Sequence, residues 1–271
     1  MSAAEHPPEA DGPANEDLHR LIIEPVEVFA ERAATIMAAT IAQTIQVRGR
    51  CVLAVGTGDA SYRVLTALAC QELAWDAVHV VPTEQLLDRR RSSADGSGDD
   101  PGPRSGDEDA DGSEIAGAQI SAPADDSGPS RLHALFADLP VSWLDLPITT
   151  EEIASFGRTL AVLTDDPPSI DLAVLELGPD GHTAKLLPDD PAMREVLASA
   201  ALTGDDSAGR RWVTLTRPVF DRARAVLWLV AGADRAPALG RLLVGDLTMP
   251  AGLIRPRQSV VVADSDAARQ A

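Results

Sequence analysis

The chain has few of the features that mark a secreted, membrane-bound or metal-binding protein. Its 271 residues include only two cysteines, Cys51 and Cys70, and their spacing fits neither a Cys-x-x-Cys pair nor a set of metal ligands. No apolar run is long enough to cross a membrane. Residues 1–16 lack the basic start and the apolar run of a signal peptide. These absences predict a cytoplasmic protein with two reduced thiols and no bound metal.

Basic residues are also scarce. The chain has 23 Lys and Arg against 42 Asp and Glu, which gives a formal net charge of −19. Such a charge repels nucleic acids and anionic membranes, because binding to phosphate backbones requires clustered cations. We therefore expect neither nucleic acid nor membrane as a partner. A small phosphorylated ligand is compatible with this charge, since a few local cations and backbone N–H groups can hold one phosphate.

One internal segment differs in composition from the rest. Residues 92–130 consist mostly of Ser, Gly, Asp, Pro and Ala, with ten acidic residues and a single basic one, Arg104. A segment of this kind cannot bury enough apolar surface to offset the entropy lost on ordering. We predict a disordered tail over residues 1–16 and one α/β domain over residues 17–271, interrupted by a disordered acidic insertion at residues 92–130.

Outside the insertion, short apolar runs rich in β-forming residues alternate with helical patterns. The predicted strands are residues 51–55, 77–81, 141–144, 172–177, 212–215, 225–230 and 259–262, and the clearest predicted helices are residues 25–46 and 61–73. This alternation indicates an α/β fold with a doubly wound, mainly parallel sheet sandwiched by helices. Ligands of such sheets bind at the carboxyl ends of the strands, so we expect the chemistry in the loops after residues 55, 81, 177 and 230.

The most informative loop follows the predicted strand at residues 172–177. A turn rich in Gly and Pro presents Asp180 and His182. An imidazole can accept a proton from an attacking water, and a carboxylate two residues away can orient it. The alternative is a purely structural turn in which Asp180 accepts from backbone amides and His182 is merely exposed.

The sequence of this loop resembles a known family. Residues 177–184 read Leu-Gly-Pro-Asp-Gly-His-Thr-Ala and are followed by an apolar pair and Pro188, which is similar to the signature of 6-phosphogluconolactonases. The related glucosamine-6-phosphate deaminases continue differently after the histidine. Further resemblances in the same order are residues 75–80, 213–216, 231–236 and 249–251. The resemblance implies hydrolysis of a phosphorylated sugar lactone without a cofactor, with His182 as general base and Asp180 as its support.

The resemblance also implies a phosphate-binding loop after the first predicted strand of the sheet. Gly56, Thr57, Gly58 and Ser61 occupy the place of a family loop whose N–H groups and hydroxyls hold the phosphate at a helix N-terminus. Asp59 departs from that pattern because it adds a negative charge, and its alternative role is that of a helix N-cap. The loop also approaches Gly-x-Gly-x-x-Gly, but its third glycine is absent, which disfavours a dinucleotide site.

The remaining phosphate contacts are only partly matched. Arg235 takes the place of a family lysine and keeps its charge; the alternative is a solvated cation at a helix start. Glu84 retains a carboxylate of the second loop, but Leu86 replaces the family arginine there. Arg89 lies close enough in sequence to replace that cation, or belongs to a solvated junction beside the acidic insertion.

Three functions follow from this resemblance. The first is hydrolysis of 6-phospho-glucono-1,5-lactone to 6-phosphogluconate in the oxidative pentose phosphate pathway. The second is a catalytically degenerate homologue that binds a neighbouring enzyme such as glucose-6-phosphate dehydrogenase, an expectation motivated by Asp59 and Leu86. The third is isomerisation or deamination of an amino-sugar phosphate, which the residues after His182 disfavour.

Overall fold

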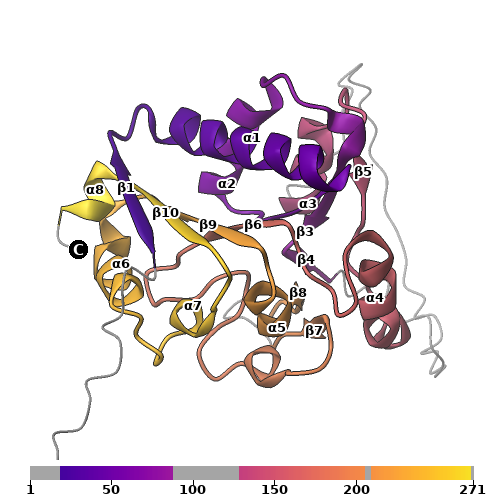
Figure 1. Cartoon of the computed structure of the whole chain (residues 1–271). Helices are drawn as coiled ribbons and strands as arrows, with labels where there is room; N and C mark the ends of the chain where they lie inside the picture. The colour runs from indigo at the N-terminus through magenta and orange to yellow at the C-terminus, as the bar shows by residue number, and fades with distance from the viewer. Residues whose placement is uncertain (1–18, 88–127, 205–208, 270–271) are drawn as a thin grey trace, which may run out of the picture.

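The computed structural model describes residues 19–87, 128–204 and 209–269. Seven strands form one sheet in which all neighbours are parallel (Figure 1). In spatial order they are β1 (Arg20–Glu24), β10 (Ser259–Asp264), β9 (Ala225–Val230), β6 (Leu172–Glu176), β2 (Cys51–Val55), β3 (Val78–Pro82) and β5 (Ser142–Trp143). The predicted doubly wound, mainly parallel α/β fold is confirmed.

One predicted strand belongs to a different sheet. β8 (Trp212–Leu215) has the predicted bounds, but it pairs antiparallel with β4 (Glu84–Leu86) and β7 (Ala200–Leu202) in a small separate sheet. All four residues of β8 are buried, so this strand reads like one from the centre of a parallel sheet. Its assignment to the parallel sheet was wrong because burial on both faces does not reveal the partner strand.

Helices cover both faces of the large sheet, as Figure 1 shows for α1 and α2 on one side and α5, α6 and α7 on the other. The helices are α1 (Phe29–Arg48), α2 (Asp59–Ala69), α3 (Gly128–Leu135), α4 (Thr150–Leu163), α5 (Arg217–Asp221), α6 (Ala236–Leu243), α7 (Pro250–Leu253) and α8 (Ser265–Ala268), with 3-10 turns η1 (Trp75–Ala77), η3 (Pro191–Arg194) and η4 (Ala233–Arg235). Among the described residues, no helix is long and apolar enough to cross a membrane.

Successive residues of the central strands face opposite cores, as the pleat of a strand requires. In β2, Leu53 packs with α1, α2 and α3, whereas Val52 and Ala54 pack in the core shared with α4 to α8. Both cores are fully apolar at their centres, where Phe29 and Trp228 have no exposed surface. The rigid sheet between them holds the strand ends, and therefore the functional loops, in fixed positions.

The acidic insertion lies almost entirely outside the described residues. The structure describes the chain up to Leu87, one residue after β4, and again from Gly128, where α3 begins. Residues 128–130 therefore belong to α3 and not to the predicted insertion. The start of a helix was hidden because Gly128, Pro129 and Ser130 have the same composition as the segment before them.

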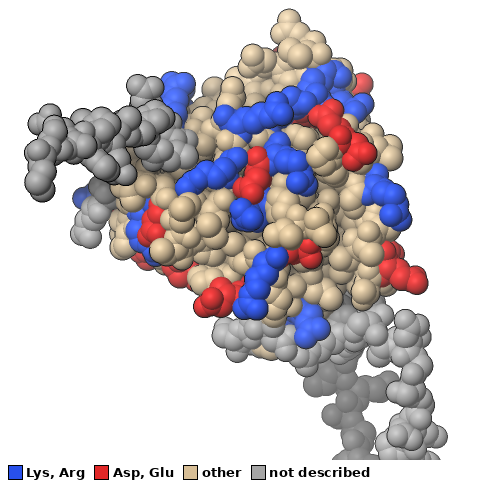
Figure 2. Space-filling view, turned by 60° about the horizontal axis from the view of Figure 1, so that its bottom comes forward, with Lys and Arg blue, Asp and Glu red and all other residues tan. Residues whose placement is uncertain are grey.

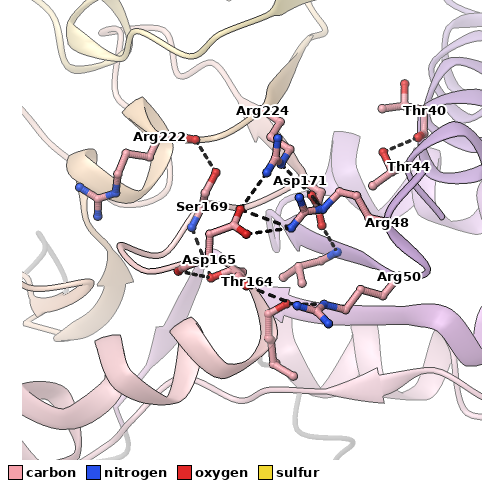
Figure 3. A network of polar contacts seen from close by, with 12 residues as sticks. Thr40, Thr44, Arg48, Arg50, Thr164, Asp165, Ser169, Asp171, Arg222 and Arg224 are labelled. Atoms are coloured by element: carbon pink, nitrogen blue, oxygen red, sulfur yellow. Dashed lines mark hydrogen bonds and ion pairs between the residues drawn. The ribbon is translucent and has the colours of Figure 1, made fainter. Parts of the chain in front are cut away.

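A buried carboxylate joins three segments at the amino end of β6 (Figure 3). Asp171 accepts from the Val52 N–H at 2.9 Å and lies 3.0 Å from Arg48 Nε and 3.2 Å from Arg224 Nε. Asp165 contacts the same two arginines from the surface. Burial raises the pKa of Asp171 above its ordinary value, against the opposing effects of the Val52 N–H and both guanidinium groups. This network fixes β6 next to β2 at the edge of the sheet opposite to the functional loops.

Candidate active site

The candidate site lies where the winding of the sheet reverses. From β2 the chain continues outward through β3 to β5, whereas β6 is followed on its other side by β9 and β10. Loops after two such neighbouring strands diverge and leave room for a ligand between them. A cavity of about 320 Å³ lies at this point. Larger hollows of about 760 and 600 Å³ occur elsewhere on the surface, but neither includes His182.

The cavity brings together most of the residues predicted for the site. Its lining residues are Gly56, Thr57, Gly58, Thr83, Glu84, Arg131, Leu175, Glu176, Leu177, Gly178, His182, Ala184, Lys185, Arg210, Trp212 and Arg235. Ser61 is fully buried and does not line the cavity. Arg89 lies outside the described residues.

His182 and Asp180 form a pair within the turn that follows β6. Asp180 Oδ1 accepts from the His182 backbone N–H at 3.0 Å and lies 2.5 Å from His182 Nδ1. With Nδ1 donating its proton to the carboxylate, Nε2 keeps the lone pair that can accept a proton. Burial raises the pKa of Asp180, but the two hydrogen bonds and the charge of the His182 ring outweigh it and hold this pKa below its ordinary value. Asp180 is thus an ionised partner that orients the imidazole.

Two glycines shape the turn: Gly178 leaves room for the imidazole, and Gly181 leaves room for Met249. A Cβ atom on Gly178 would lie 2.2 Å from His182 Nδ1, so any larger residue there would displace the ring. Gly181 has a φ of +87°, and a Cβ atom on it would lie 2.6 Å from Met249 Sδ. The Gly181 carbonyl accepts from the Ala251 N–H at 3.0 Å, which ties the turn to α7. The Gly-Pro-Asp-Gly-His sequence therefore serves to hold one imidazole orientation.

The turn continues in an unusual conformation that places Lys185 in the cavity. Ala184 and Lys185 both have left-handed backbones, with φ of 48° and 57°. Non-glycine residues rarely adopt this conformation and need support from their surroundings. Thr214, in β8, donates its hydroxyl to the Ala184 carbonyl at 2.5 Å. The small antiparallel sheet thus supports the turn that carries His182.

The loop after β2 differs from the expected phosphate cradle, because two carboxylates bind its N–H groups. Glu84 Oε1 accepts from the Thr57 N–H at 3.0 Å and from the Thr57 hydroxyl at 2.7 Å. Glu176 Oε1 accepts from the Ser61 N–H at 2.8 Å. Glu84 is the first residue of β4 and Glu176 is the last residue of β6. The N-terminal turn of α2 is therefore partly occupied by anions of the protein itself.

Glu176 is held tightly in this position. A Cβ atom on Gly58 would lie 2.5 Å from both carboxylate oxygens, so the close contact depends on glycine at that position. Burial raises the pKa of Glu176, and the charge of Glu84 raises it further, against the hydrogen bonds from Ser61 and the charge of Arg235. The net result is a pKa above the ordinary value of a glutamate.

Asp59 does not cap α2. The N-cap position is Gly58, and Asp59 is the first helical residue, with a side chain that is 92% exposed. Its carboxylate lies 3.4 Å from Arg131 Nη1. The alternative prediction, that Asp59 is the N-cap, was wrong, because the N-cap is the residue before it. Asp59 instead adds a negative charge to the first turn of the helix.

Arg235 lies beside the histidine turn, at the end of η4. Its Nε donates to the Leu177 carbonyl at 3.1 Å, and its Nη1 lies 2.8 Å from Asp234 Oδ1. These contacts orient the guanidinium group at the wall of the cavity, with its side chain 31% exposed. Arg235 therefore lines the cavity in a fixed orientation. The alternative, a solvated cation at a helix start with no role in the site, fits these contacts less well.

Three further cations that were not predicted for the site line the cavity: Arg131, Lys185 and Arg210. Arg131 stacks over the ring of Tyr62 at 4.2 Å, and Lys185 Nζ and Arg210 Cζ lie 4.5 and 5.7 Å from the ring of Trp212. Lys185 is the only lysine of the chain, a signal that was available in the sequence. Figure 2 shows Lys and Arg side chains gathered on one face of the molecule despite its negative net charge.

Among the described residues, no group of three or more His, Cys, Asp and Glu side chains is arranged to hold a metal ion. The cavity and its surroundings offer an imidazole with an ionised partner, two carboxylates that bind backbone N–H groups, and several cations. This set suits proton transfer at an anionic, hydroxyl-rich substrate.

The fold and this site define a class of known structures. The chain is similar to the crystal structure of 6-phosphogluconolactonase from Thermotoga maritima, with a TM-score of 0.69 over 91% of this chain and 100% of that chain at 16% identity. It is also similar to a monomeric glucosamine-6-phosphate deaminase, with a TM-score of 0.66 over 93% and 100% of the two chains at 15% identity. At these identities the likeness establishes the fold.

Sequence comparison narrows the class to a family. The family described as glucosamine-6-phosphate isomerases/6-phosphogluconolactonase matches residues 126–263, and the chain belongs to this family. A 6-phosphogluconolactonase from Synechocystis is 29% identical over 238 residues, which cover 87% of this chain and 90% of that protein. The resemblance stated from the sequence is confirmed.

Proposed function

We propose that this chain hydrolyses 6-phospho-glucono-1,5-lactone to 6-phosphogluconate, a step of the oxidative pentose phosphate pathway. The observation that carries this proposal is the His182–Asp180 pair at the edge of a cation-lined cavity, in a family member whose curated relative from Synechocystis is a 6-phosphogluconolactonase. The substrate is a phosphorylated sugar lactone, which matches a site that combines cations with hydrogen-bonding carboxylates.

In the proposed reaction His182 acts as general base. Its Nε2 accepts a proton from water while the hydroxide forms a bond to the lactone carbonyl carbon. Collapse of the tetrahedral intermediate breaks the bond between this carbon and the ring oxygen, and the proton held on Nε2 passes to that oxygen. Asp180, 2.5 Å from Nδ1, stabilises the imidazolium formed in between.

Arg235 is proposed to attract the phosphate group. Its position at the cavity wall and its fixed contacts with Leu177 and Asp234 support this role. Gly56, Thr57 and Gly58 line the same cavity, and the missing side chain of Gly58 leaves room for the Glu176 carboxylate. Glu84, which was expected at the site, accepts hydrogen bonds from Thr57 and thereby shapes this loop.

The direct test is hydrolysis of freshly prepared 6-phospho-glucono-1,5-lactone by the purified chain, measured against the spontaneous rate. A rate well above that background is expected, and it should saturate with substrate. Glucosamine 6-phosphate is assayed beside the lactone, because the family description includes isomerases of this substrate. Conversion of the amino sugar without lactone hydrolysis would contradict the proposal and show that the chain is an amino-sugar phosphate deaminase or isomerase.

A second candidate function is binding without efficient catalysis. The observation that favours it is the occupation of the α2 N-terminus by Glu84 and Glu176, which leaves fewer N–H groups for a phosphate. In this case the chain is proposed to bind glucose-6-phosphate dehydrogenase, the enzyme that produces the lactone. A wild-type protein that gives no rate above background and forms a complex with that dehydrogenase in size-exclusion chromatography would support it.

A cytoplasmic location is part of the proposal. The two cysteines are free thiols, Cys51 in the core and Cys70 at the surface. An exposed free thiol is stable in a reducing compartment. Localisation of a tagged full chain tests this point.

A further inference from the structure

Glu176 is the one ionisable residue of a strand that is otherwise apolar. β6 reads Leu-Ala-Val-Leu-Glu, and its first four residues are buried. The glutamate side chain reaches from β6 to the first turn of α2, where its Oε1 accepts from the Ser61 N–H. The closest approach is to Gly58, the N-cap of that helix.

The N-terminus of an α-helix attracts anions, because its first N–H groups lack intrahelical partners and the helix dipole is positive there. In this chain the Glu176 carboxylate occupies the position of such an anion, because it accepts the Ser61 N–H in the first turn of α2. Glu84 binds the N–H of Thr57 just before the same helix, so two negative charges converge on one short loop. A substrate phosphate at this point would displace or repel both carboxylates.

Four cations line the same cavity: Arg131, Lys185, Arg210 and Arg235. Lys185 and Arg210 lie against Trp212, and Arg235 is oriented by the Leu177 carbonyl. The cavity therefore combines two carboxylates that bind N–H groups at the start of α2 with four cations carried by other segments, of which Arg131 also contacts α2 through Asp59 and Tyr62.

We infer that Glu176 is a specificity-determining residue that closes the N-terminus of α2 to phosphate, so that side-chain cations alone hold the phosphate of the substrate. This inference rests on the proposed function for the identity of the ligand. The carboxylates then face the hydroxyl-rich part of the lactone, for which they are hydrogen-bond acceptors.

The inference is tested by the affinity of the purified chain for inorganic phosphate, measured by calorimetry at constant ionic strength. Glu176→Ala removes the internal anion and uncovers the N–H groups of α2. We expect phosphate to bind about tenfold tighter than to the wild type, the effect of gaining roughly one charge-assisted contact. Glu176→Gln removes the charge but keeps the side-chain volume, and a smaller gain is expected.

Glu72→Ala is the matched control, since this exposed glutamate lies beyond the opposite end of α2 and its loss changes the net charge equally. Its phosphate affinity should equal that of the wild type. Equal affinities in wild type and Glu176→Ala, or the same gain in Glu72→Ala, would overturn the inference. If Glu176→Ala does not fold, Glu176→Gln decides, and no gain in that variant overturns it.

Phosphate binding requires no turnover. If the chain has no lactonase activity, the phosphate measurements can still confirm the role of Glu176. If the chain is an active lactonase but its phosphate affinity is the same with and without Glu176, only the role of Glu176 is refuted.

Discussion

At the scale of single residues, the imidazole of His182 carries the proposed chemistry. His182→Ala should lower lactonase turnover by about two to four orders of magnitude, the range for loss of a positioned general base. Folding should be preserved, because the side chain lies on a half-exposed turn and not in either core. The measurement is kcat together with a thermal melt.

The matched control for this variant is His133→Ala. His133 Nε2 also contacts a carboxylate, Asp145 Oδ1, at 2.9 Å, but it stacks on Trp143 away from the cavity. Turnover of this variant should match the wild type. If His182→Ala turns over as fast as His133→Ala, the base is another group.

Arg235 should act on binding more than on turnover. Its proposed ligand, the phosphate, is remote from the reacting carbonyl and is bound alike in the ground and transition states. A charge-assisted contact of this kind contributes about 1.5 to 3 kcal/mol. Arg235→Ala should therefore raise KM about tenfold to hundredfold with little change in kcat. Steady-state kinetics tests this, with Arg235→Lys as the variant that keeps the charge; a loss confined to kcat would contradict the assignment.

Glu176 should make stability depend on pH in a predictable direction. Burial raises its pKa above the ordinary value of 4.5, with Glu84 adding to the rise and Arg235 opposing it. The ionised form is thus unfavourable in the folded state, and this destabilisation is present above the raised pKa and disappears as the pH falls through it. Glu176→Gln should melt at a higher temperature than the wild type at pH 7. The difference should shrink on acidification; a difference that is constant with pH would argue against an ionised Glu176.

At the scale of secondary-structure elements, the Asp171 network joins β6 to β2 and β9. Asp171 is 1% exposed and bound to two arginines, whereas Asp165, which contacts the same arginines, is 46% exposed. Removal of one partner from a buried ion pair costs about 3 to 5 kcal/mol, and an exposed pair contributes at most about 1 kcal/mol. Asp171→Ala should therefore destabilise the chain several times more than Asp165→Ala in denaturant unfolding. Equal losses would show that the network acts mainly through its exposed half.

Sequence periodicity predicted those strands and helices whose own residues form a clear apolar pattern. β2 and β9 have exactly the predicted bounds, because each is a continuous apolar run that ends in glycine or alanine turns. β1 lies at the edge of the sheet, and its apolar run, residues 21–23, is only three residues long between Arg20 and Glu24, which is too short to mark a strand. β4 and β7 have three residues each, too few for a periodic pattern.

At the scale of the whole molecule, the proposal is one domain with an insertion between β4 and α3. Residues 88–127 replaced by a short Gly/Ser linker should leave the melting temperature and kcat nearly unchanged, because a segment of this composition has few apolar side chains to bury. The control is Leu132→Ala in α3, whose fully buried side chain should cost about 2 to 5 kcal/mol. A loss of stability in the linker variant would refute the prediction that the domain folds without this segment. A loss of activity alone would indicate that the segment has a role at the site.

The sequence by itself determined the fold class and the histidine turn. Both depend on local properties: the alternation of apolar strands and helices, and a Gly-Pro-Asp-Gly-His turn whose first glycine leaves room for the ring. The chemistry expected of His182 and Asp180 follows from two residues that are neighbours in the chain, so their 2.5 Å contact required no knowledge of distant segments.

Only the tertiary structure decided what binds the N–H groups of α2 and which cations line the cavity. Glu176 and Ser61 are 115 residues apart, and their contact exists because parallel pairing places the end of β6 beside the loop after β2. Arg131 and Lys185 reach the cavity from α3 and from the histidine turn, and no spacing in the sequence relates them. Charge at a site is a property of side chains that converge in space, and periodicity along the chain carries no information about that convergence.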